Sequence, residues 1–113
     1  MVIITLHIAL FIAYRHRCGV DPKHVRTLLR ASARYAIAAL QDLNVAIAVL
    51  HANYAAGYLW ALSDIATTSE IEAMSGINWK RFRDAIIDIQ DMATKRLVED
   101  GDAHYLAHIA GDV

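Results

Sequence analysis

The stretch from Ala36 to Ala66 limits what this chain can fold into more than any other feature, because it is apolar on nearly every side of a helix. At 100° per residue, one side carries a stripe of large apolar residues and the opposite side carries Val, Ala and Leu. The stripe consists of Leu43, Ile47, Leu50, Tyr54, Tyr58, Ala61 and Ile65. A helix that is hydrophobic all round must be covered all round. We therefore expect an all-α fold: a small helical bundle with a long apolar central helix, closed by homo-oligomerisation.

The composition supports this expectation. The chain has 113 residues, which predicts a single helical domain over 1–113, and 57% of them are hydrophobic against about 45–50% in an average soluble domain. This apolar excess must enter a subunit interface or a membrane. The net charge of −1 predicts no overall field that attracts nucleic acid or anionic lipid. The only cysteine, Cys18, cannot form an internal disulfide, which fits a cytoplasmic location.

Helix start and stop signals divide the domain. Asp21 followed by Pro22 is a strong helix start, and the helix over 22–66 is either continuous or broken near residues 41–44. Residues 69–98 form a hairpin that resembles a helix-turn-helix. Residues 99–113 form a tail, with a turn at 100–102.

The hairpin has its own signals. Ser69 and Glu72 have the spacing of a capping box, and Gly76 is the residue type that ends helices. Asn78 then caps a helix from Trp79 to about residue 98. Its core stripe is predicted to be Phe82, Ile86, Ile89, Ala93 and Leu97.

The N-terminal segment, residues 1–17, is apolar from 2 to 14 and ends with Arg15, His16 and Arg17. A helix that spans a membrane needs about 20 apolar residues. A signal peptide carries its basic residues before the apolar run. We therefore expect a helix packed against the bundle. The alternatives are a membrane anchor formed by residues 2–14, a β-strand favoured by the β-branched start, and a targeting segment.

Small residues of the apolar helix predict where two copies meet. Small side chains let the backbones of neighbouring helices approach closely. The predicted dimer interface consists of Ala48, Ala52, Ala55, Ala56 and Leu59.

Polar and aromatic residues also lie within the apolar helix. His51, Tyr54 and Tyr58 fall on one face at spacings of three, four and seven. Buried polar groups need partners, and such pairs fix the register between helices. We favour this structural role over a small-ligand pocket that would be lined by Tyr54, Tyr58 and Trp60.

The hairpin leaves a DNA-binding alternative open. The second helix would present Lys80, Arg81 and Arg83 to the phosphates. Acidic residues on the same helix cancel most of this charge, so a plain helical hairpin is favoured. The acidic residues are Asp84, Asp88 and Asp91.

Catalytic and metal-binding signals are weak. His104 and His108 are four residues apart and share a helix face, but no third ligand has a recognisable spacing. His16, Cys18 and His24 form only a loose cluster. The sequence has no motif for nucleophilic catalysis or for phosphate binding. We expect no metal, no cofactor and no enzymatic activity.

Residues 51–97 resemble a group of small uncharacterised helical proteins from marine bacteria, phages and metagenomes. The resemblance lies in the segments Asn53–Leu62, Asp64–Ala66, Ser75–Ile77 and Ile89–Lys95. This group has no established activity, so the resemblance implies no catalytic residues. The expected function is a non-enzymatic assembly or binding module acting as a homodimer. The alternatives are a DNA-binding protein and a membrane-anchored accessory subunit.

Overall fold

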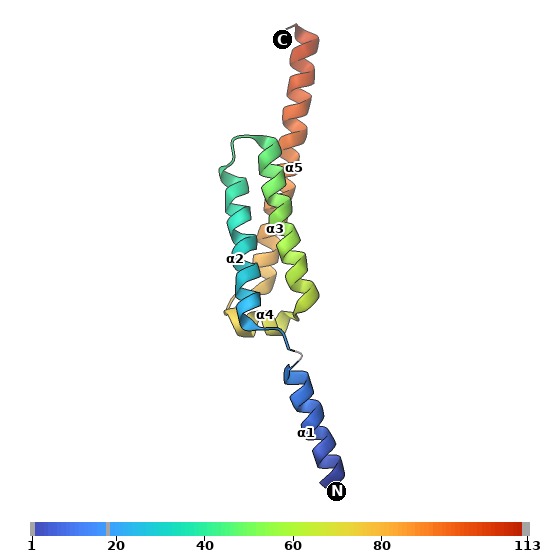
Figure 1. The fold of residues 1–113 in the computed structure, drawn as a ribbon. Coiled ribbons are helices and arrows are strands. Elements are labelled where there is room, and N and C mark those ends of the chain that lie inside the picture. The colour runs from blue at the N-terminus through green and yellow to red at the C-terminus, as the bar shows by residue number, and fades with distance from the viewer. Residues whose placement is uncertain (1, 18, 112–113) are drawn as a thin grey trace.

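A computed structural model describes the backbone of residues 2–17 and 19–111, and the side chains of residues 2–10 and 19–111. The described residues form five α-helices and contain no strand, which confirms the all-α prediction (Figure 1). The helices are α1 (Val2–Arg17), α2 (Pro22–Gln41), α3 (Val45–Ile65), α4 (Thr68–Ser75) and α5 (Trp79–Ala110). The molecule is very extended, measuring 86 × 20 × 18 Å.

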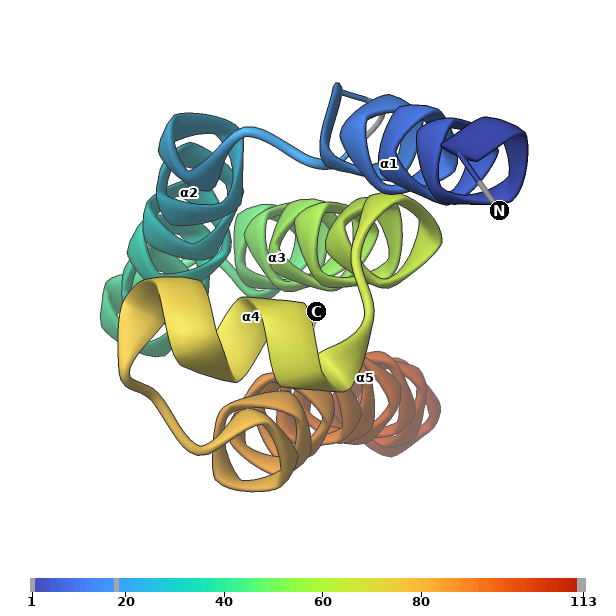
Figure 2. The same cartoon turned by 90° about the horizontal axis from the view of Figure 1, so that it is seen from below.

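Helices α2, α3 and α5 pack side by side as a three-helix bundle, and the short helix α4 crosses one end of it (Figures 1 and 2). The apolar stretch is thus broken into α2 and α3, as one of the two sequence alternatives predicted. Two polar residues cap the helices at the break. Asp42 ends α2 in extended conformation, and Asn44 begins α3, where its Oδ1 accepts a hydrogen bond of 3.0 Å from Ile47 N.

The core lies along the inner side of α3, where Leu59 and Leu62 are fully buried. Small residues let α2 and α3 approach closely. Ser32 Oγ of α2 donates a hydrogen bond of 2.8 Å to Ala55 O of α3. This bond satisfies the only buried polar side chain among the described residues and fixes the register of the two helices.

The predicted caps of α4 need one correction. The capping box joins Thr67 and Glu70, not Ser69 and Glu72. Glu72 instead accepts a hydrogen bond of 3.2 Å from Trp79 N, at the start of α5. Gly76 ends α4 as predicted, in the left-handed conformation (φ 74°) that glycine adopts without strain.

The last helix is longer than predicted. Asn78 caps α5 as expected, but the helix continues through the predicted turn at 100–102 and ends at Ala110. Gly101 lies inside the helix with open space around it. A single glycine in a helix costs only about 1 kcal/mol relative to alanine, which is too little to end a helix by itself. The final turns extend beyond the bundle, which exposes Tyr105, Leu106 and Ile109.

The N-terminal segment is a helix, so the strand alternative is wrong. The prediction that this helix packs against the bundle is also wrong. It projects from the end of the bundle where α2 begins, and its described side chains, those of residues 2–10, are all exposed (Figure 1). The physical reason lies in the bundle, where α2 and α5 already cover the inner side of α3.

Within the described residues, α3 is long and apolar enough to cross a membrane by length and composition. The core helix of a soluble bundle passes the same test. Because α3 packs against both α2 and α5, we treat it as the central helix of the bundle.

Candidate functional site

Helix α1 presents uncovered apolar side chains on all its sides. Its six large aliphatic side chains between residues 2 and 10 are each between 52% and 82% exposed. They are Val2, Ile3, Ile4, Leu6, Ile8 and Leu10. A contiguous apolar surface of this kind marks a site of interaction with a protein or a membrane.

In residues 2–10, the part of α1 whose side chains the structure describes, the polar side chains bond within the helix itself. Thr5 Oγ1 donates a hydrogen bond of 2.9 Å to Val2 O, and His7 Nδ1 donates one of 2.7 Å to Ile3 O. An apolar medium requires such internal bonds, because unsatisfied polar groups there cost several kcal/mol. Residues 2–10 are therefore suited to a non-aqueous environment despite Thr5 and His7.

The charges of the chain are separated along its length, which the net charge of −1 conceals. Residues 15–34 contain six Lys or Arg and a single acidic residue, Asp21. Lys23, Arg26 and Arg30 are exposed on the first turns of α2, next to the connection from α1. The start of α5 brings three more basic residues to the same end of the bundle (Figure 1).

The rest of α5, which runs toward the opposite end of the bundle, carries more acidic than basic residues. Residues 85–110 contain five acidic residues and two basic ones. The acidic ones are Asp88, Asp91, Glu99, Asp100 and Asp102. At the end of the bundle near α1, these six basic residues of α2 and α5 stand beside five acidic ones, so this end is only slightly basic, while the far half is acidic. The five acidic residues are Asp21, Asp64, Glu70, Glu72 and Asp84. The expectation of no attraction to anionic lipid therefore holds for the chain as a whole, and less strongly for this end.

The residues proposed for DNA contact lie at this basic end. Lys80 Nζ and Arg83 Nη2 lie 2.6 Å and 3.5 Å from the carboxylate oxygens of Asp84, while Arg81 is exposed. The Lys80 ammonium, followed by the Arg83 guanidinium, holds the pKa of Asp84 below its usual value. Two of the three cations are therefore already paired, which weakens the case for a phosphate-binding helix.

The predicted dimer interface lies inside the single chain. Its five residues are all buried against α2 and α5, so a second copy cannot reach them in the folded bundle. They are Ala48, Ala52, Ala55, Ala56 and Leu59. The prediction that these small side chains allow close helix packing is correct, but the helices that pack on them are α2 and α5 of the same chain.

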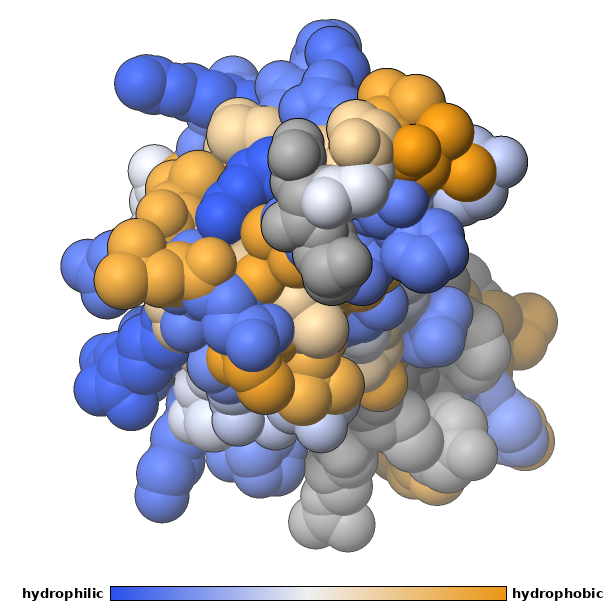
Figure 3. All heavy atoms as spheres, turned by 90° about the horizontal axis from the view of Figure 1, so that it is seen from above, coloured by the Kyte–Doolittle hydropathy of each residue, from blue (hydrophilic) through white to orange (hydrophobic). Residues whose placement is uncertain are grey.

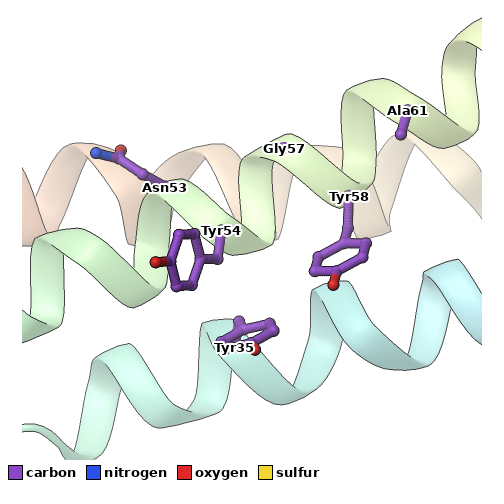
Figure 4. Close-up of a pocket in the computed structure, with 6 residues that line it drawn as sticks. All are labelled: Tyr35, Asn53, Tyr54, Gly57, Tyr58 and Ala61. Carbon is purple, nitrogen blue, oxygen red and sulfur yellow. The ribbon is translucent and has the colours of Figure 1, made fainter.

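The aromatic residues of α3 form a cluster with a residue of α2 that the sequence analysis missed, Tyr35. Its ring stacks on Tyr58 at 5.8 Å and 9°, and meets Tyr54 edge-on at 5.3 Å and 77° (Figure 4). These rings and small residues of α3 line an open hollow of about 550 Å³. Trp60 does not line the hollow, contrary to the pocket alternative.

His51 lies beside this cluster and is held by Asp42. His51 Nδ1 donates a hydrogen bond of 2.6 Å to Asp42 Oδ2, and its ring centroid lies 5.7 Å from that of Tyr35. The expected polar contact thus exists within one chain, between the end of α2 and the second turn of α3. Sequence reasoning missed Asp42 because it stands in the connection.

The outer side of α3 is exposed and uncharged. No acidic or basic residue occurs between Asp42 and Asp64, apart from His51. Five large side chains on this side are 41–50% exposed: Ile47, Leu50, Tyr54, Trp60 and Ile65. Apolar groups also reach the surface at the end of the bundle opposite α1, where Leu43 is 96% exposed and Figure 3 shows hydrophobic patches between hydrophilic ones.

No metal site is seen among the described residues, since no three His, Cys, Asp or Glu side chains come together. His104 and His108 lie on the exposed end of α5. The side chains of His16 and Cys18, which the loose cluster requires, lie outside the described residues.

No family model, no curated protein and no solved structure matches this chain. The resemblance over residues 51–97 stays a prediction. The function must therefore be argued from the chain's own surfaces.

Proposed function

We propose that the protein is a non-enzymatic helical module attached to a membrane by α1. The observation that carries this proposal is that α1 is apolar, projects from the bundle and is covered by none of its helices. The bundle, with its polar outer sides on α2 and α5, would remain in water as the part that binds partners.

The energy of transfer favours insertion of α1. Fully burying a Val, Leu or Ile side chain contributes about 1.5–3 kcal/mol. Burial of the six exposed aliphatic side chains in lipid would therefore contribute on the order of 10 kcal/mol. The internal hydrogen bonds of Thr5 and His7 reduce the penalty for taking these two residues into lipid.

The charge pattern gives the orientation. Arg15 and Arg17 end α1, and the basic residues of α2 follow directly. Basic residues near a membrane helix favour the cytoplasmic side, and each contributes about 1 kcal/mol of attraction to anionic headgroups. We therefore place the bundle in the cytoplasm, with its basic end at the headgroups and its acidic half away from them.

Helix α1 is slightly shorter than the hydrocarbon core of a bilayer is thick. Its 16 residues give a length of about 24 Å at 1.5 Å per residue, compared with about 30 Å for the hydrocarbon core. Two effects accommodate a helix that is shorter than the hydrocarbon core. Arginine side chains at the end of such a helix are long enough to extend to the headgroups, and the bilayer thins locally around it.

The test is flotation of the full chain with vesicles of phosphatidylcholine and phosphatidylglycerol. Replacing Ile4 and Ile8 by Glu should release the chain to the soluble fraction, because two charges would enter lipid. The matched control replaces Ile37 and Leu40 by Glu. These are apolar residues of the bundle with similar exposure, and their replacement should leave flotation unchanged. Recovery of the original chain in the soluble fraction would overturn the proposal.

A further inference from the structure

We propose that the outer side of α3 is the contact surface for a second copy of this chain, with the two α3 helices parallel. We call this surface the outer α3 face, defined by Ile47, Leu50, Tyr54, Gly57, Trp60 and Ile65. It differs from the interface expected from the sequence, whose residues are buried. The choice of the parallel arrangement rests on the proposed membrane attachment, whereas the surface itself does not.

The area of the outer α3 face is sufficient for a dimer. Its five large side chains are 41–50% exposed. With the small residues between them they offer roughly 600 Å² per copy, so a pair would bury roughly 1,200 Å², at the lower limit of stable interfaces. Attachment to one membrane confines both copies and raises their effective concentration, so that an interface of this size is sufficient.

The charge and shape of the face fit a second copy. Residues 43 to 63 include no Asp, Glu, Lys or Arg, so over this part of the face two copies would meet without repulsion or desolvation of charges. Asp64, seven residues after Gly57, is exposed on the same line of the helix, so a parallel pair would bring the two Asp64 carboxylates near each other at the C-terminal end of the face. Near the middle, a Cβ added to Gly57 would have no atom within 4 Å. A partner helix can therefore approach the backbone of α3 closely at this point.

The two edges of the face differ in a complementary way. Along the edge next to α2, Tyr54 and Tyr58 lean on Tyr35 and form the open hollow (Figure 4). Trp60 follows Asn53 by two helical turns and therefore lies on the other edge, since Asn53 Oδ1 is bonded to Gln90 of α5 at 2.9 Å. One edge thus offers a large projecting ring and the other a hollow lined by rings.

The direction of α1 selects the parallel arrangement. Both copies must send α1 into the same membrane, so their symmetry axis runs along the bundle. With such an axis, the Trp60 edge of each copy meets the tyrosine edge of the other, and each Trp60 enters the partner's hollow. An antiparallel pair would instead bring the two Trp60 edges together and would point the two α1 helices in opposite directions.

The experiment is oxidative crosslinking of the full chain in vesicles of phosphatidylcholine and phosphatidylglycerol, with Cys18→Ser as the background. Leu50→Cys and Gly57→Cys lie on the midline of the face, where a parallel pair brings each residue opposite its own copy. Both should give disulfide dimers. Arg30→Cys and Asp88→Cys, exposed on α2 and α5, serve as controls and should give little dimer.

The outcomes separate the alternatives. Crosslinking of Gly57→Cys alone would indicate antiparallel helices and overturn the arrangement, because residues 50 and 57 are about 10 Å apart along a helix. Crosslinking at neither position above the controls would overturn the surface itself and leave the face to lipid or to another protein. Membrane attachment is measured on the same samples by flotation. Floating chains without crosslinks contradict only the dimer, and crosslinked chains that stay soluble contradict only the membrane attachment.

A second variant tests whether the face acts through contact with a partner. Gly57→Leu fills open space in the single chain and removes a glycine from a helix, so it should not lower the melting temperature. It should nevertheless reduce crosslinking at Leu50→Cys several-fold, because the added side chain separates the two backbones. Unchanged crosslinking would overturn the proposed close approach at Gly57.

Discussion

A hydrogen bond between His51 and Asp42 spans the connection between α2 and α3, with His51 Nδ1 2.6 Å from Asp42 Oδ2. Asp42 is the C-cap residue of α2, and His51 lies in the second turn of α3. The same connection is held from α5, since Arg96 Nη2 donates a hydrogen bond of 3.3 Å to Asp42 O. The three bundle helices therefore meet at Asp42.

The first prediction concerns the coupling between these two side chains. Asp42→Asn and His51→Ala should each lower the free energy of unfolding, and the double variant should lose less than the sum. Both side chains are about one quarter exposed, so we expect a coupling of about 0.5–1 kcal/mol. Urea unfolding of the four proteins in detergent, followed by circular dichroism, measures it. Strict additivity would show that the contact does not stabilise the bundle.

The second prediction separates the core of α3 from its outer face. Ala52→Asp buries a charge beside α2 and α5 without a partner and should unfold the bundle, with a loss of about 3 kcal/mol or more. Ala61→Asp places the same charge on an exposed position and should leave the helical circular dichroism spectrum unchanged. A folded, helical Ala52→Asp variant with the original melting temperature would contradict the packing of α3.

Sequence reasoning identified the helices better than it identified what each helix does. The periodicity of residues 43–65 separated two sides of α3 correctly, but it could not tell which side the chain itself covers. The structure buries the side of Ala52 and leaves the stripe of Leu50 exposed. Both sides are apolar, so only the positions of α2 and α5 decide between them.

The same limit applies to the charges and the ends of helices. The basic residues of α2 and of α5 are about 50 positions apart in sequence, and only the fold brings them to one end of the bundle. Gly76 and Gly101 look alike in sequence, since a polar residue precedes each of them. One ends a helix and the other lies inside one, because Gly76 is followed by the new cap at Asn78 and Gly101 by residues that continue the helix.

The third prediction uses this difference between the two glycines. Gly76→Ala forces a side chain into the left-handed conformation (φ 74°) and should destabilise the protein by about 1 kcal/mol. Gly101→Ala lies in a helix with open space around it and should stabilise α5 by about 0.5–1 kcal/mol. Thermal unfolding should therefore shift in opposite directions. A lowered melting temperature for Gly101→Ala would support the turn that the sequence predicted at residues 100–102.

The last prediction tests the separation of charge along the bundle. Lys23→Glu and Lys95→Glu change the net charge of the chain by the same amount, but Lys23 lies beside α1 and Lys95 in the acidic half. If the basic end faces anionic headgroups, Lys23→Glu should weaken binding to phosphatidylglycerol vesicles about thirtyfold, because it changes the charge by two units at about 1 kcal/mol each. Lys95→Glu should have little effect. The difference should shrink as salt is added and should vanish with neutral phosphatidylcholine vesicles, since screening and removal of the lipid charge abolish the attraction. Equal weakening by both substitutions would show that net charge alone governs binding, and the orientation of the bundle at the membrane would then be wrong even if α1 is the anchor.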